Sequence, residues 1–70
     1  MPNFSPEVIR SMRAALDEVM TQIPFEQATP SVKAALAEYI LKAAARGQTS
    51  YEDLIAAAAG QIQTILSMLS

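Results

Sequence analysis

The side chains that could carry out acid–base chemistry in this chain form two pairs of adjacent carboxylates, Asp17–Glu18 and Glu52–Asp53. A catalytic or metal-binding pair needs carboxylates that converge, whereas adjacent residues of a helix do not face each other. The chain contains no histidine and no cysteine, so the commonest general base, the thiol nucleophile and the usual zinc ligands are missing. We therefore predict that the protein is not an enzyme and has no catalytic residue, cofactor or metal site.

The length and the net charge of the chain narrow the functional classes that remain possible. A chain of 70 residues forms one domain at most, and its core must be small. The net charge of −2 argues against a nucleic-acid-binding surface, which normally carries clustered Lys and Arg. The first residues, MPNFSPEV, contain neither a basic leader nor an apolar signal core. The expectations are a cytoplasmic protein that does not bind nucleic acid.

The stretch from Thr29 to Gly47 carries the clearest helix signals. Thr29 is a good N-cap, Pro30 suits the first helical position, and Gly47 can adopt the left-handed conformation that ends a helix. Apolar residues occupy two opposite sides of this helix. One side bears Val32, Leu36, Tyr39, Ile40 and Ala43, and the other bears Ala34, Ala37, Leu41 and Ala45. Such a helix is usually buried on more than one side, so we expect it to be central.

Helical signals also flank this central stretch. Ser5 and Pro6 begin a helix that Pro24 ends, and Thr49 with Glu52 matches a capping box that begins another. Both flanking helices show apolar residues at heptad spacing, namely Ile9, Met12, Leu16, Val19 and Ile23 in the first, and Tyr51, Ile55, Ala58, Ile62, Ile65 and Leu69 in the last. In the first connection, Phe25 is expected to pack against the end of the bundle.

The predicted fold is therefore all-α, with helices at about 6–23, 30–46 and 50–69 in a single domain spanning 1–70. Because the connections are short, consecutive helices should be antiparallel and form an up-down-up three-helix bundle with the middle helix central.

The segment Ile40–Ala59 resembles the scaffold half of the helix-turn-helix in response-regulator transcription factors. The matching positions are Ala45, Gly47, Thr49, Glu52 or Asp53, Leu54 or Ile55, and Ala56. The resemblance implies a small DNA-binding or transcription-accessory protein. A recognition helix with basic side chains should then follow a further turn, but residues 54–70 carry no charge and no obvious break. A glycine stop followed by a threonine cap also joins helices of many other kinds.

The uncharged segment 54–70 raises the question of a membrane. Its length is marginal for a span, and polar Gln and Thr residues interrupt it, so we predict no membrane association. Gly60, Ala56 and Ser67 lie opposite the apolar stripe of this helix. Small residues there could allow close helix approach, or Gly60 could simply be a tolerated surface residue.

As a whole, the motifs Ala15–Val19 and Ala37–Gly47, with a Leu-containing helix after them, resemble short all-helical bacterial proteins of unassigned function. The function that we expect is a protein-interaction or structural module that forms a homodimer, with an unidentified protein partner also possible and with DNA binding as the alternative. The predicted interface consists of Ala34, Ala37, Leu41, Ala45 and Met68, with Phe4 as a further candidate. In the competing arrangement, the outer helices cover both sides of the middle helix and leave a monomer.

Overall fold

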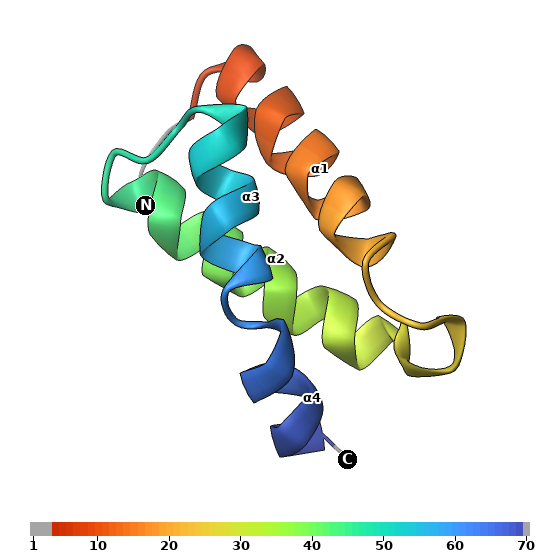
Figure 1. Cartoon of the computed structure of the whole chain (residues 1–70). Helices are drawn as coiled ribbons and strands as arrows, with labels where there is room; N and C mark the ends of the chain where they lie inside the picture. The colour runs from red at the N-terminus through yellow and green to blue at the C-terminus, as the bar shows by residue number, and fades with distance from the viewer. Residues whose placement is uncertain (1–3, 70) are drawn as a thin grey trace.

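The computed structural model describes residues 4–69, so residues 1–3 and 70 of the predicted domain lie outside the described part. The chain forms helix α1 (Pro6–Met20), the 3-10 turn η1 (Phe25–Gln27) and helices α2 (Pro30–Ala45), α3 (Tyr51–Ala59) and α4 (Ile62–Leu69) (Figure 1). The predicted all-α class is confirmed. The three-helix arrangement is not, because residues 4–69 contain four α-helices.

The first two helices begin where the sequence predicts. The Ser5 hydroxyl accepts the backbone N–H of Val8 at 3.3 Å, and the Thr29 hydroxyl accepts that of Val32 at 3.2 Å. In each case a proline follows the cap. At this position an N–H group would have no partner within the helix, so the missing N–H of proline costs no hydrogen bond. These caps fix the starts of α1 and α2.

The C-terminal end of α2 also agrees with the prediction to within one residue. Gly47 has φ 96°, in the left-handed region that favours glycine. The N–H groups of Gly47 and Gln48 donate to the carbonyl oxygens of Ala44 and Ala43, each at 3.0 Å. This pair of bonds is a Schellman motif, which satisfies carbonyls that the end of the helix would leave free.

Helix α1 ends at Met20, three residues before the predicted end. The N–H groups of Gln22 and Ile23 donate to carbonyl oxygens three residues back, at 3.0 and 3.3 Å, instead of the four that an α-helix requires. Pro24 is the physical reason, because its ring disfavours helical geometry at the preceding residue and tightens the last turn.

The predicted single helix 50–69 is wrong in two respects, of which the first is its cap. Ser50, and not Thr49, is the N-cap: its hydroxyl accepts the N–H of Asp53 at 3.1 Å. The cap therefore lies one residue after Thr49, the residue predicted to form a capping box with Glu52. Two adjacent hydroxyl residues can both serve as caps, and residue type alone does not choose between them.

The second error is the break between α3 and α4. Gly60 is the C-cap of α3, and the N–H of Gln61 donates to the carbonyl oxygen of Ala58, three residues back. A Cβ at position 60 would lie 3.3 Å from the carbonyl oxygen of Ala56, a tight contact that glycine avoids. Gly60 thus ends a helix and is not a mid-helix residue, and α4 begins two residues later.

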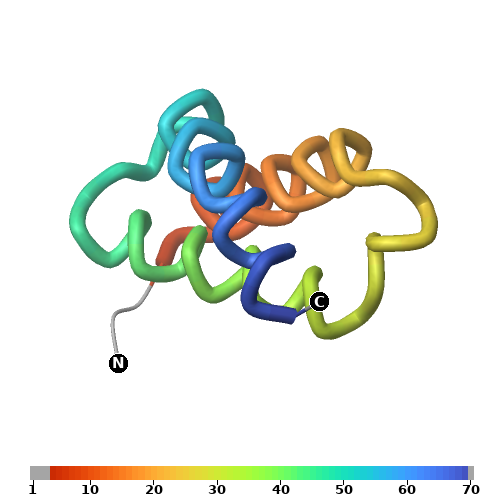
Figure 2. The backbone as a smooth tube through the Cα atoms, turned by 60° about the horizontal axis from the view of Figure 1, so that its bottom comes forward, coloured from red at the N-terminus to blue at the C-terminus, as the bar shows by residue number. Residues whose placement is uncertain are grey.

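The connection between α1 and α2 also differs from expectation. Phe25 does not pack against the bundle, because its side chain is 94% exposed. It is the first residue of η1, which projects from the body of the molecule at the end where α1 and α2 are joined (Figures 1 and 2).

Helix α2 packs against α1, α3 and α4, and α1 also packs against α3. The largest fully buried side chains are Leu36 and Ile40 of α2, Leu54 of α3 and Val19 of α1. Leu54 lies beside the predicted apolar stripe and not in it. The predicted stripe residues Ile9, Tyr51 and Leu69 are 41 to 51% exposed, because each lies near a helix terminus, where neighbouring helices cover less of the surface.

Candidate functional site

The carboxylates considered for catalysis do not form a site. Asp17 and Glu18 lie near the end of α1, whereas Glu52 and Asp53 lie in the first turn of α3, and all four are exposed. Among residues 4–69, no group of three or more acidic side chains lies close enough together to hold a metal ion. The carboxylates of Glu52 and Asp53 lie in the first turn of α3, where negative charge is favourable to the helix dipole.

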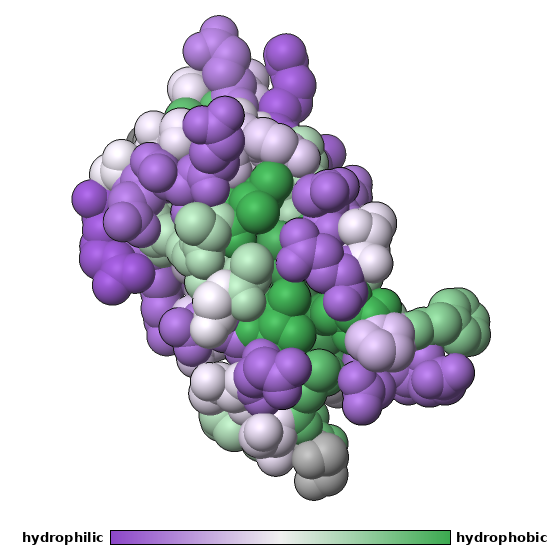
Figure 3. All heavy atoms as spheres, viewed as in Figure 1, coloured by the Kyte–Doolittle hydropathy of each residue, from purple (hydrophilic) through white to green (hydrophobic). Residues whose placement is uncertain are grey.

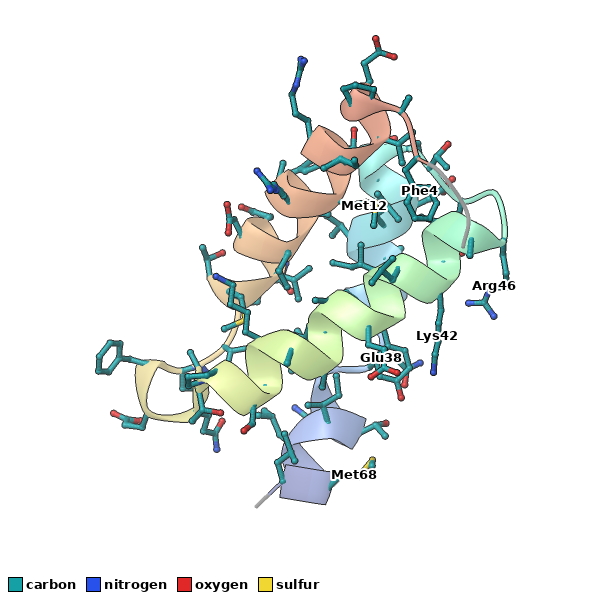
Figure 4. All side chains as sticks on the ribbon, turned by 180° about the vertical axis from the view of Figure 1, so that it is seen from behind. Phe4, Met12, Glu38, Lys42, Arg46 and Met68 are labelled. Carbon is teal, nitrogen blue, oxygen red and sulfur yellow. The ribbon has the colours of Figure 1, made fainter. Side chains whose placement is uncertain are left out.

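An apolar hollow lies between α1 and α2, and we call it the α1–α2 groove. It has a volume of about 310 Å³ and is lined by Phe4, Ile9, Met12, Arg13, Leu16, Ala37, Ile40 and Leu41. Figure 4 shows Phe4 and Met12 in the angle between these two helices, toward the beginning of α1 and the end of α2. Arg13 is the one charged residue in this lining, so the groove can bind an apolar group beside a single cation.

The α1–α2 groove brings together part of the predicted interface. Ala37 and Leu41 line it, and Leu41 is 47% exposed. Ala34 and Ala45 are exposed on the same side of α2, at spacings that place them above and below Leu41. Phe4, the further candidate, lines the groove as well.

Met68 lies elsewhere. It is 74% exposed and lines a second groove of about 200 Å³ between α2 and α4, together with Tyr39, Lys42 and Ile65 among others. In Figure 4, Met68 and Phe4 are on opposite sides of α2. One flat contact centred on Leu41 would therefore not include Met68.

Two charged residues of α2, Glu38 and Lys42, line the second groove. Lys42 Nζ lies 3.8 Å from a carboxylate oxygen of Glu38 and 5.9 Å from the centre of the Tyr39 ring. Both charged side chains are about two-thirds exposed, so this ion pair contributes little stability. Its position matters more, because it places polar groups along the side of α2 that faces away from the α1–α2 groove.

The sequence prediction missed the contribution of α1 to this groove. The apolar spacing places Ile9, Met12 and Leu16 in the core stripe, but α1 buries Ala15 and Val19 more completely. The available signal was the width of the apolar stripe, which exceeds what one neighbouring helix can cover.

Apolar atoms also reach the surface on the opposite face. Figure 3 shows a central apolar strip among α1, α3 and the beginning of α4, bordered by hydrophilic side chains. Half-buried residues that pack on the core are expected to give such a strip. Within residues 4–69, none of the helices is both long enough and apolar enough to cross a bilayer.

Comparisons with protein-family models, with curated proteins and with solved structures gave no significant match to this chain. The resemblances to short bacterial helical proteins and to helix-turn-helix scaffolds therefore stay predictions. The α1–α2 groove, with the Leu41 side of α2 beside it, is the candidate site that the geometry itself defines.

Proposed function

We propose that this protein is a small interaction module that self-associates through the α1–α2 groove and the adjoining Leu41 side of α2. The observation that carries this proposal is the uncovered apolar side of the central helix. Helices α1, α3 and α4 pack against α2, yet Ala34, Leu41 and Ala45 stay exposed. An apolar side left open in so small a domain is typical of a surface that binds another protein.

The dimensions of the molecule favour a contact along its length. A stable interface buries about 800 Å² on each partner, which is about one-sixth of the 4747 Å² surface of this chain. The molecule measures 34 × 19 × 18 Å. An end of 19 × 18 Å is too small for such a contact. A long face is large enough, because the side chains that project from it add surface area beyond its flat dimensions. The α1–α2 groove lies on a long face.

The DNA-binding alternative has less support. The break at Gly60 does create a second helix after α3, as a helix-turn-helix would need, but α4 contains no charged residue. In addition, α4 packs against α2 and follows roughly the direction of α3 (Figure 1). A recognition helix instead presents polar and basic side chains to the major groove.

Light scattering after size exclusion tests the proposal directly. We expect a mass of about 15 kDa, twice the 7.5 kDa of one chain, when the protein is loaded at ~100 µM, a concentration at which even a weak micromolar dimer forms. A mass of 7.5 kDa at that concentration would contradict self-association. Leu41→Lys should shift the mass to that of the monomer, because it places a charge in the middle of the apolar contact.

A further inference from the structure

The side chain of Phe25 is the most exposed large apolar group among the described residues. It is 94% exposed, although the turn η1 that carries it is itself ordered by hydrogen bonds from Gln27 N–H to Pro24 O at 2.8 Å and from Ala28 N–H to Phe25 O at 3.2 Å. A phenyl ring held in water by a structured turn gains nothing for the isolated chain. An exposed aromatic residue on a hydrogen-bonded turn is instead the type that can anchor a protein–protein contact.

The α1–α2 groove has the size and chemistry to accept this ring. Its volume of about 310 Å³ exceeds the ~150 Å³ in which an apolar cavity can hold benzene. All of its lining residues except Arg13 are apolar. The same chain thus carries both an exposed aromatic side chain and an open apolar groove, and the two are at different ends of the α1–α2 pair.

On this basis we infer that the η1 turn of one copy docks in the α1–α2 groove of a second copy, with the Phe25 ring among the apolar side chains. The inference rests on the proposed self-association and specifies its contacts. The charges agree with it: Glu26, exposed and next to Phe25, would arrive beside Arg13, the one charged residue of the groove. An opposite charge at the rim stabilises the correct alignment and disfavours others.

The geometry allows both copies to dock at once. The groove lies toward the end of α2 (Figure 4), whereas η1 precedes its beginning. A two-fold axis perpendicular to α2 near Ala34 therefore places each η1 turn over the groove of the other copy. The two α2 helices then cross antiparallel at Ala34, where a small exposed side chain permits close approach. In this arrangement Ala45 and Met68 lie outside the contact.

Phe25→Ala tests the anchor, with Gln27→Ala in the same exposed turn as the matched control. We expect Phe25→Ala to weaken dimerisation at least about 100-fold in sedimentation equilibrium, because each dimer loses two anchors. Gln27→Ala should change the dissociation constant by less than about threefold. Circular dichroism checks that both variants fold. A wild-type dimer that Phe25→Ala leaves unchanged would overturn this inference alone, whereas a monomeric wild type would overturn the proposed function with it.

A mixing experiment tests whether the contact is reciprocal. Phe25→Ala removes the anchor and Leu41→Lys blocks the groove, so neither variant alone should dimerise. Their mixture restores one intact contact, and we expect heterodimers to form at least about 10-fold more tightly than either homodimer.

Charge exchange gives a second test: Arg13→Glu or Glu26→Arg should weaken dimerisation, and the double exchange should restore it to within about threefold. No gain on mixing and no recovery in the double exchange would contradict the docking.

Discussion

The substitution Leu36→Ala probes the packing of α2 most directly. Leu36 is fully buried, with 0% of its surface exposed, in the middle of the core. Its replacement by alanine removes three carbons, worth about 2–3 kcal/mol of transfer free energy at ~0.8 kcal/mol each. The cavity left behind raises the loss to about 2–5 kcal/mol. A core of this size supplies only about 3–5 kcal/mol in total, so much of the variant should be unfolded at 25 °C.

The matched control is Leu69→Ala, which removes the same three carbons from a side chain that is 51% exposed at the end of α4. It should lower the free energy of unfolding by no more than about 1 kcal/mol. Urea denaturation followed by circular dichroism, with all proteins at one concentration, measures the two losses. Equal losses for the two variants would show that Leu36 is not at the centre of the core.

Three further predictions concern the helix ends and DNA. Gly47→Ala should cost about 1–2 kcal/mol in urea denaturation, since its Cβ would meet no atom within 4 Å and only the positive φ opposes it; Gly47→Asn should cost less. Ser50→Ala should cost about 0.5–2 kcal/mol and Thr49→Ala clearly less, and the reverse order would contradict the assigned cap. Finally, a DNA anisotropy titration at ~50 mM salt should show no binding at low micromolar protein. Low salt strengthens electrostatic binding to DNA, so this condition is a stringent test.

The sequence was sufficient where one residue type determines the local geometry. Ser5 and Thr29, each followed by proline, start helices at the predicted residues, and Gly47 ends α2 with a positive φ. These signals act within a few residues and need no knowledge of the tertiary structure. The burial of Leu36 also follows from spacing alone, because it lies in the middle of the apolar side of a strongly signalled helix.

The sequence was insufficient where competing local geometries have similar free energies. Thr49 and Ser50 are both good caps, and residue type does not choose between them. At Gly60 the apolar spacing continues without interruption, but α3 ends there, and a Cβ at this position would lie 3.3 Å from the carbonyl oxygen of Ala56. Phe25 is predicted to pack against the end of the bundle because it is apolar, but its side chain is 94% exposed. Each error concerns a choice that residue type alone does not decide.

The composition of the core connects stability to the proposed assembly. Of the eleven buried hydrophobic residues within residues 4–69, four are alanines, which add little apolar volume. Larger side chains, including Ile9, Leu41 and Phe25, stay on the surface instead. A single copy of the chain therefore leaves part of its apolar surface exposed to water. A second copy that covers this area would stabilise the folded chain by mass action, since only the folded form presents the α1–α2 groove. Folding and self-association would then be coupled, with the same few side chains contributing to both.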